Sequence, residues 1–186
     1  MTKNMKIFVK FPRKDTKYSG ISYCIFDIFP YLCHPMTMQQ LNLPPCEVKI
    51  GEKDGRQTIL DFLRRKYVAL TPEEWVRQHF VHYLVEQKGY PKGLLANELE
   101  LRVGDKRLRC DTVLYDKNLQ PRMIIEYKAP AIQIQQKTFD QIVVYNLLLH
   151  ADYLIVSNGL QHYCCQMDYE RHSYTFLHEI PDYTAL

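Results

Sequence analysis

The sequence lacks the patterns that mark membrane proteins, disulfide-linked proteins and nucleotide-driven motors. No run of about 18 or more apolar residues occurs, so we expect no membrane-spanning helix and no membrane partner. No Gly-x-x-x-x-Gly-Lys-[Ser/Thr] phosphate loop is present, so we expect no ATP site. The six cysteines include no Cys-x-x-Cys pair. Because Cys110, Cys164 and Cys165 fall in strand-like runs, we expect buried, reduced thiols in a cytoplasmic protein, and neither a disulfide framework nor a zinc site.

Charge of one sign is also scarce. The 24 lysines and arginines nearly balance the 21 aspartates and glutamates, which leaves a net charge of +3. Such a mild excess permits a nucleic-acid partner without requiring one, because a local basic patch matters more than the sum. The 186 residues fit one domain, with or without an extension, and the 46% hydrophobic content is enough for a core.

The chain before residue 67 is interpreted as two parts. Residues 1–35 are rich in Tyr and Phe, and Met36 and Met38 stand where they end. We expect residues 1–35 to be an N-terminal extension, with the native start at one of these methionines. One or two extra strands on the edge of the domain are the alternative. Residues 36–66 are predicted to form a lead-in β-hairpin, because turn residues separate two strand-like runs.

Residues 67–186 are predicted to form the main domain. The clearest helix begins at Thr71, where an N-cap threonine, a proline at N1 and Glu74 at N3 form a capping box. Apolar residues follow at helical spacing, and Gly89 is a natural stop. The elements predicted after it are strands at Leu94–Val103, Lys106–Tyr115 and Arg122–Lys128, a helix at Phe139–His150, and strands at Tyr153–Ser157 and Gln161–Met167. The order α-β-β-β-α-β-β indicates an α/β (α+β) fold.

Asp111 lies inside the second of these strands. Period two places it on one face with Arg107 and Arg109, opposite the face of Cys110 and Thr112, which looks like core. A surface Arg–Asp–Arg pairing would by itself explain a lone aspartate in such a strand.

Glu126 and Lys128 change that interpretation. The strand that carries them begins with apolar residues on both faces, which is typical of a central, buried strand. A glutamate in such a strand is costly unless it is paired or binds a cation. One alternative is an ion pair between Glu126 and Lys128. The other is a site in which two carboxylates hold a divalent cation and a lysine activates or orients water. Gln141 and Tyr145 lie at i and i+4, on one face of the following helix.

Several short segments match a known pattern together, although each is weak alone. They are Leu70–Gln78, Lys88–Pro91, Arg109–Asp111, Ile125–Pro130, Gln141–Asn146 and Ser157–Gly159. With them, the chain from about Tyr67 to Met167 resembles the N-terminal nuclease domain of type I restriction endonuclease R subunits. That family belongs to the PD-(D/E)xK superfamily, near the RecB-type nucleases. The resemblance implies a restriction-endonuclease-like core, a central mixed β-sheet flanked by helices, so that residues 67–186 would be a nuclease-like domain.

The resemblance also assigns roles to individual residues. It implies that Asp111 and Glu126 bind Mg²⁺, for which Mn²⁺ can substitute, and that Lys128 positions or activates water and stabilises charge on the phosphate. Gln141 and Tyr145 would support the site and contact the nucleic-acid backbone. The family has an acidic residue on its first helix, for which Glu74 is the candidate, although the capping box already gives Glu74 a structural role. Where the superfamily's name has proline before the aspartate, this chain has cysteine.

The hairpin that leads to Asp111 is basic. Its cations either bind flanking phosphates or simply face water at an exposed hairpin tip. They are Arg102, Lys106, Arg107 and Arg109. The sequence as a whole predicts a Mg²⁺-dependent DNA endonuclease-like domain that hydrolyses phosphodiester bonds and lacks the ATP-driven motor of full R subunits. Its expected partners are DNA and other restriction or repair subunits. The alternatives are a non-catalytic nucleic-acid-binding or assembly module with the same fold, and a structural protein in which Glu126 and Lys128 are only an ion pair.

Overall fold

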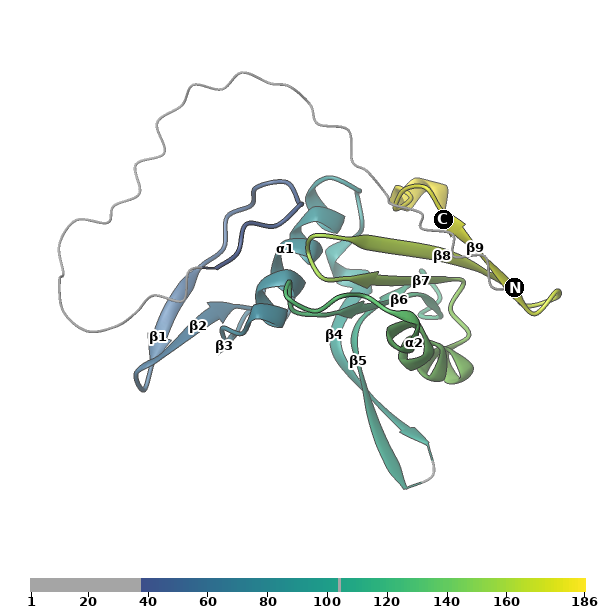
Figure 1. The fold of residues 1–186 in the computed structure, drawn as a ribbon, viewed down its shortest axis with the longest axis horizontal. Coiled ribbons are helices and arrows are strands. Elements are labelled where there is room, and N and C mark those ends of the chain that lie inside the picture. The colour runs from purple at the N-terminus through teal and green to yellow at the C-terminus, as the bar shows by residue number, and fades with distance from the viewer. Residues whose placement is uncertain (1–37, 104) are drawn as a thin grey trace, which may run out of the picture.

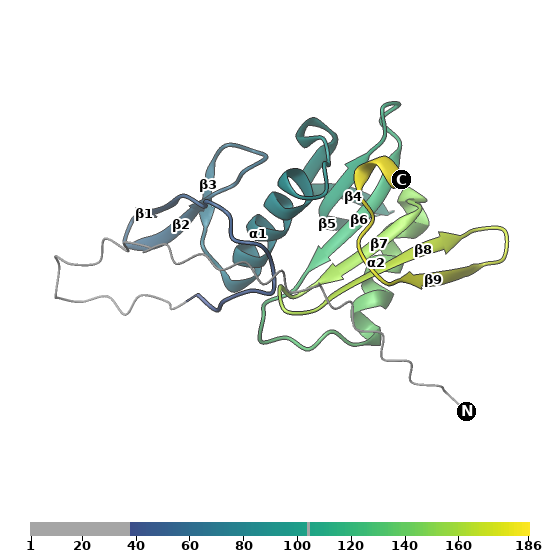
Figure 2. The ribbon, with the colours of Figure 1, turned by 90° about the horizontal axis from the view of Figure 1, so that it is seen from above.

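A computed structural model describes residues 38–103 and 105–186, which form two β-sheets and two α-helices (Figure 1). The chain is therefore a mixed α/β protein. In both views, α1 lies between the smaller sheet and the larger one (Figures 1 and 2). The predicted extension at residues 1–35 lies outside the described residues. Among those that are described, no helix combines the length and the apolar character needed to cross a bilayer.

The smaller sheet is antiparallel and has the order β1-β2-β3. Its strands are β1 (Ile50–Lys53), β2 (Arg56–Leu60) and β3 (Tyr67–Ala69). Asp54 and Gly55 make the turn with φ of 53° and 71°, the left-handed pair that a two-residue hairpin prefers. The segment before residue 67 thus contains a β-hairpin, whose first strand begins at Ile50. The short β3 was not predicted.

Helix α1 (Pro72–Glu86) begins where the sequence predicts. The Thr71 side chain accepts a hydrogen bond of 3.0 Å from the Glu74 backbone N–H, which satisfies one of the free donors at the helix start. Val76, Phe80 and Leu84 are fully buried on its inner face. The first turn of α1 is thereby fixed against the larger sheet, and with it the two glutamates that this turn carries.

The larger sheet has the order β4-β5-β6-β7-β8-β9 and is mixed, because only β6 and β7 run parallel. A parallel pair needs a crossover, and α2 supplies it. The elements of this part are η1 (Lys92–Leu94), β4 (Leu95–Val103), β5 (Lys106–Tyr115), β6 (Pro121–Tyr127), α2 (Gln136–Leu149), β7 (Tyr153–Ser157), β8 (His162–Asp168), β9 (Ser173–Leu177) and η2 (Tyr183–Ala185). The edge strand β9, whose first three residues are exposed, was not predicted.

The core lies on both faces of the larger sheet. On one face, α1 packs on a cluster that includes Ile125 and Tyr127 of β6. On the other, Ile142 and Tyr145 of α2 pack on a cluster that includes Ile124. Strand β6 is thus buried on both sides, as predicted. Cys110, Cys164 and Cys165 are buried free thiols, which agrees with the prediction for these three.

One face of α2 differs from the sequence-based expectation. The apolar residues of this segment predict a helix packed through Ile142, Val143, Leu147 and Leu149, but Val143 and Leu147 are 38% and 69% exposed. The helix also begins at Gln136, three residues before the predicted start at Phe139. Ile142 is buried as predicted, and together with Tyr145 it packs against residues of β6 and β7.

Candidate functional site

Asp111 lies where the sheet is interrupted. The ladder between β5 and β6 starts only at Thr112 and Ile125, and the ladder between β4 and β5 omits the pair Glu98 and Asp111. Glu98 has a φ of 55°, a left-handed conformation that costs a non-glycine residue energy and is concentrated at functional sites. In place of the missing ladder bond, the Asp111 carboxylate accepts a hydrogen bond of 2.8 Å from the Tyr127 backbone N–H.

The surroundings of Asp111 differ from those expected of a surface strand face. Asp111 is only 7% exposed, and its Oδ1 is 2.8 Å from the guanidinium of Arg77 on α1. Arg109, which was grouped with it on that face, is 3.6 Å from Glu98 instead. Asp111 is therefore a buried carboxylate between two strands and a helix, because the break in the ladder turns it inward.

Glu126, Lys128, Gln141 and Tyr145 are brought together as a hydrogen-bonded group. Lys128 Nζ donates to Glu126 Oε1 at 2.7 Å and to Gln141 Oε1 at 3.2 Å. The Gln141 amide donates to Glu126 Oε1 at 2.8 Å and to the Tyr145 hydroxyl at 3.0 Å. The side chains come from β6, the residue that follows it, and one face of α2. The i and i+4 spacing on α2 thus places both polar groups over the glutamate.

The second oxygen of Glu126 has a different environment. Glu126 Oε2 is buried and has no hydrogen-bond partner. Burial, and next the charge of Asp111, raise the pKa of Glu126, while Lys128 opposes the rise. A buried carboxylate oxygen without a donor is unfavourable unless a cation satisfies it. Asp111 and the free oxygen of Glu126 therefore offer two anionic ligands close to each other.

Lys128 is held as a cation. Burial lowers its pKa, but the hydrogen bond to Glu126 and the charges of Glu126, Glu73 and Asp111 outweigh burial, so that the pKa of Lys128 is raised. The ammonium therefore acts as a hydrogen-bond donor and as a positive charge at neutral pH. It can orient a water molecule or stabilise a developing negative charge.

The first turn of α1 brings one of its two glutamates into electrostatic contact with this group. Glu74, the residue predicted, directs Oε2 to Arg77 at 2.7 Å and Oε1 to the Gln78 amide at 2.7 Å, so the structure connects it to Asp111 only through Arg77. The neighbouring Glu73 is half-buried, and the charges of Asp111 and Lys128 act on its pKa, which burial raises. Sequence reasoning missed Glu73 because the capping box drew attention to the next residue.

Arg77 is the second residue that sequence reasoning missed. It is 3% exposed and binds three carboxylates: Glu74 at 2.7 Å, Asp111 at 2.8 Å and Glu98 at 3.3 Å. Glu98 also pairs with Arg64. A buried arginine in the middle of the apolar face of a helix is the signal that could have identified it, since such a charge is retained only with partners.

The residues fit a hard divalent cation. Within residues 38–103 and 105–186, no group of three or more His, Cys, Asp or Glu side chains is arranged to hold a metal. Mg²⁺ requires less, because it keeps several waters and uses one or two carboxylates together with substrate phosphates. Asp111 and Glu126 are the two carboxylates that could fill this role, and the buried Oε2 of Glu126 has no hydrogen-bond partner that would compete with a cation.

The hairpin formed by β4 and β5 projects from the body of the protein (Figure 1). Arg102 lies directly opposite Arg107 in its register, and both side chains are exposed, as is that of Arg109. Like charges opposite each other destabilise an antiparallel pair, so this basic face costs energy in the absence of an anionic partner. Of Lys106, the structure describes the backbone, which pairs with Val103.

Comparison with known proteins gives the following relations. A search of curated proteins finds no match. Among solved structures, the chain is similar to a fragment assigned as an HsdR subunit of a type I restriction enzyme from Vibrio vulnificus YJ016, with 17% sequence identity and a TM-score of 0.44. The similarity covers 60% of this chain and 24% of that one, so the chain spans about a quarter of the solved relative. The profile of the family described as "Type I restriction enzyme R protein N terminus (HSDR_N)" matches residues 72–181, more than half of the sequence and the whole of the site described above. The chain therefore belongs to the family of the type I restriction enzyme R protein N terminus.

Proposed function

We propose that this chain is a Mg²⁺-dependent nuclease domain with a PD-(D/E)xK core, which hydrolyses DNA phosphodiester bonds. The observation that carries the proposal is the Glu126 carboxylate. One of its oxygens is held by Lys128 and Gln141, and the other is buried beside Asp111 without a hydrogen-bond donor. An ion pair alone would leave no reason for the second oxygen to stay unsatisfied.

Each residue has a defined part in this proposal. Asp111 and Glu126 would hold the cation, which supplies Lewis-acid activation of the phosphate and of the attacking water. Lys128 orients the water and donates a hydrogen bond to the negative charge that develops on the phosphate. Gln141 fixes Glu126 and Lys128 in position, and Tyr145 fixes Gln141. Arg77 keeps Asp111 in place from the opposite side.

DNA reaches the site along the basic hairpin in this proposal. Arg107 and Arg109 precede Asp111 on the same strand, so a nucleic-acid backbone bound along the hairpin would lead toward the carboxylates. Family membership suggests other restriction–modification subunits as further partners. Arg107 is exposed and forms no ion pair with a carboxylate of the described residues, which supports a role in binding phosphates.

Cleavage assays with purified protein test the proposal directly. Single-stranded, linear duplex and supercoiled DNA are incubated with Mg²⁺ or Mn²⁺, and products are followed on gels. The wild type is expected to cut at least one of these forms, and Asp111→Asn and Glu126→Gln are expected to lose activity by about a hundredfold or more. Lys117→Gln, which removes an exposed charge from the turn between β5 and β6, is the matched control and should cut like the wild type.

Two results would refute the proposal. One is the absence of cleavage of every DNA form with either metal. The other is an Asp111→Asn variant that cuts as well as the wild type. Metal-independent binding of DNA without any product would instead support a non-catalytic binding module with the same fold. Urea unfolding of Glu126→Gln, measured in parallel, shows whether a loss of activity reflects a loss of folded protein.

A further inference from the structure

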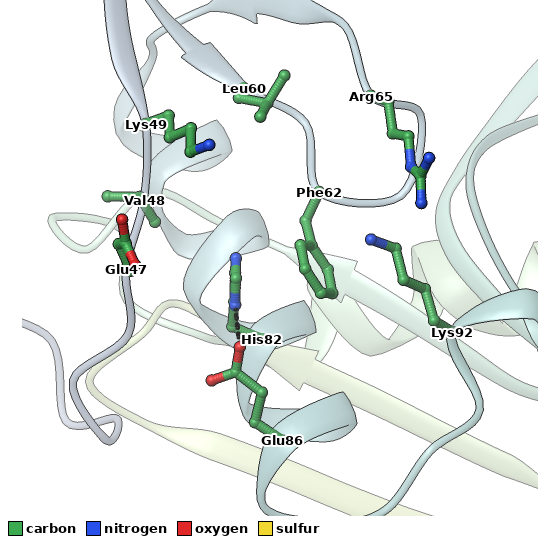
Figure 3. A pocket seen from close by; sticks show the side chains of 9 residues that line it. All are labelled: Glu47, Val48, Lys49, Leu60, Phe62, Arg65, His82, Glu86 and Lys92. Carbon is green, nitrogen blue, oxygen red and sulfur yellow. Dashed lines mark hydrogen bonds and ion pairs between the residues drawn. The ribbon is translucent and has the colours of Figure 1, made fainter.

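A cavity lies between α1 and the smaller sheet, on the side of the helix away from the candidate nuclease site (Figure 3). Its volume is about 510 Å³, which is within the usual range of small-molecule sites. The walls come from the segment before β1, the end of β2 and the loop after it, the second half of α1, and η1. None of the residues assigned to the nuclease site lines it.

Three cations line this cavity, and two of them lie on the same side of Phe62. Figure 3 shows the head groups of Arg65 and Lys92 turned toward each other on one side of Phe62, while Lys49 points in from the segment before β1. In the part of the chain that the structure describes, no carboxylate forms an ion pair with any of the three. By contrast, the neighbouring Arg64 is paired with both Asp61 and Glu98. The positive charges of Arg65 and Lys92 repel each other, and an anion bound between them would offset this repulsion.

The cations are presented by ordered structure. The Asp61 carboxylate accepts hydrogen bonds from the backbone N–H groups of Leu63 and Arg64, and the Arg65 N–H donates to the Asp61 carbonyl at 2.9 Å. This turn holds Arg65 at a φ of 54°. Asp61 itself is engaged by Arg64 and Asn97, so its charge is already shared between two other side chains.

Lys92 is fixed in a similar way. Its Nζ lies 3.4 Å from the centroid of the Phe62 ring, a cation–π contact that restricts the lysine before any ligand arrives. Burial and next the charge of Arg65 lower the pKa of Lys92, against a smaller opposing effect of Asp61. The lysine is thus positioned for an anion and would gain stability from one.

The other residues that line the cavity indicate which chemical groups a ligand would carry besides its anion. Phe62, Leu60 and Val48 supply apolar surface. Glu86 Oε1 lies 2.6 Å from His82 Nδ1. Both glutamates, Glu47 and Glu86, lie on the side of Phe62 opposite to Arg65 and Lys92 (Figure 3). The anionic group is therefore expected at one end of the cavity, with an organic group against the apolar wall.

We propose that this cavity binds a phosphate ester, whose phosphoryl group lies between Arg65 and Lys92. An arginine offers planar, paired donors to phosphate oxygens, and a lysine adds a compact charge. The same phosphoryl chemistry is present in a free nucleoside monophosphate and in the backbone of DNA. This proposal does not depend on the nuclease proposal, since it concerns other residues and no catalysis.

Calorimetric titration in metal-free buffer with EDTA tests the inference, because no cleavage can interfere. The probes are inorganic phosphate, deoxyadenosine monophosphate and a short DNA duplex. Arg65→Gln and Lys92→Met are expected to weaken binding of the phosphorylated probe by about tenfold or more each, the effect of losing one charge-assisted hydrogen bond. Lys66→Gln, which removes the same charge from the residue next to Arg65 outside the cavity, should bind like the wild type. Lys92→Met keeps the apolar contact with Phe62, and thermal unfolding shows whether each variant is folded.

The probes distinguish the source of the phosphoryl group. Two results together indicate that the site takes a free ester. Deoxyadenosine monophosphate binds the wild type but not the Arg65 and Lys92 variants, and the affinity of these variants for the duplex is unchanged. The DNA backbone is indicated when the variants lose duplex affinity and the wild type binds neither small probe. The inference is overturned when the wild type binds none of the probes, or when both variants bind them as tightly as Lys66→Gln does.

Discussion

Replacement of Arg77 by leucine should destabilise the protein strongly. The guanidinium is 3% exposed and is the shared partner of Glu74, Asp111 and Glu98. Leucine preserves most of the apolar volume but leaves two buried carboxylates without their cation. Removing one partner of a buried ion pair costs about 3–5 kcal/mol, a large part of the roughly 5–15 kcal/mol that stabilises a typical domain.

The effect is measurable with the intrinsic fluorescence of the protein. Trp75 is the only tryptophan in the sequence and lies on α1, where its indole N–H donates to the Gln39 carbonyl at 3.1 Å. It therefore reports on unfolding of the helix that carries Arg77. With a urea dependence of about 2 kcal/mol per molar, the expected loss moves the unfolding midpoint down by roughly 2 M.

Arg109 provides the matched control. It shares the partner Glu98 with Arg77, but its side chain is 61% exposed and the distance is 3.6 Å. Arg109→Leu should therefore cost less than about 1 kcal/mol. Adding Asp111→Asn to Arg77→Leu should cost less than the sum of the single changes, by about 1–3 kcal/mol, because the two residues are in contact. The reasoning is refuted if Arg77→Leu costs no more than Arg109→Leu.

Three further outcomes are expected. Burial lowers the pKa of His162 from 6.5 to about 4, so the neutral ring contributes stability above pH 6.5 that is lost as the pH falls to 4. The loss is roughly 3 kcal/mol, and urea unfolding of His162→Gln at both pH values should show a flatter dependence. Gly159→Ala should destabilise by about 2 kcal/mol or more, since its Cβ would lie 2.7 Å from Leu41 at a φ of +80°; Gly55→Ala, with φ +71° and open space, measures the backbone strain alone. Arg107→Gln should weaken DNA binding and reduce the slope of log affinity against log salt by about one, whereas an unchanged slope would exclude this residue from phosphate contact.

The sequence predicted those parts of the fold that depend on local chemistry. The start of α1 follows from the cap at Thr71, and the bounds of β5 and β7 agree with the predicted ones. Local spacing also gave the pair Glu126 and Lys128, two residues apart along a strand, and the pair Gln141 and Tyr145, four apart on a helix. The expectation that these two pairs belong to one site came from the family resemblance. These short-range rules hold because burial on both faces of β6 and on one face of α2 leaves little freedom in orientation.

The parts that could not be predicted depend on distant contacts. Strict period two fails at Asp111 because Glu98 leaves the regular strand conformation and turns the carboxylate inward. Arg77 meets Asp111 across 34 positions of sequence, which no local pattern encodes. The choice between Glu73 and Glu74 likewise depends on how the first turn of α1 faces the larger sheet.

The hydrogen bond from the Tyr127 backbone N–H to the Asp111 carboxylate gives Asp111 a structural role as well, because it connects strands β5 and β6 where their ladder is interrupted. A chain with this fold would need that connection between the strands whether or not it cleaves DNA. An aspartate at this position in a related protein is therefore weak evidence that the protein has nuclease activity. Lys128 lies just beyond the end of β6, is partly exposed, and bonds no backbone group through its side chain but only Glu126 and Gln141 of the proposed site. Within the nuclease proposal, its replacement in a relative would therefore be more informative about the chemistry than the presence of Asp111.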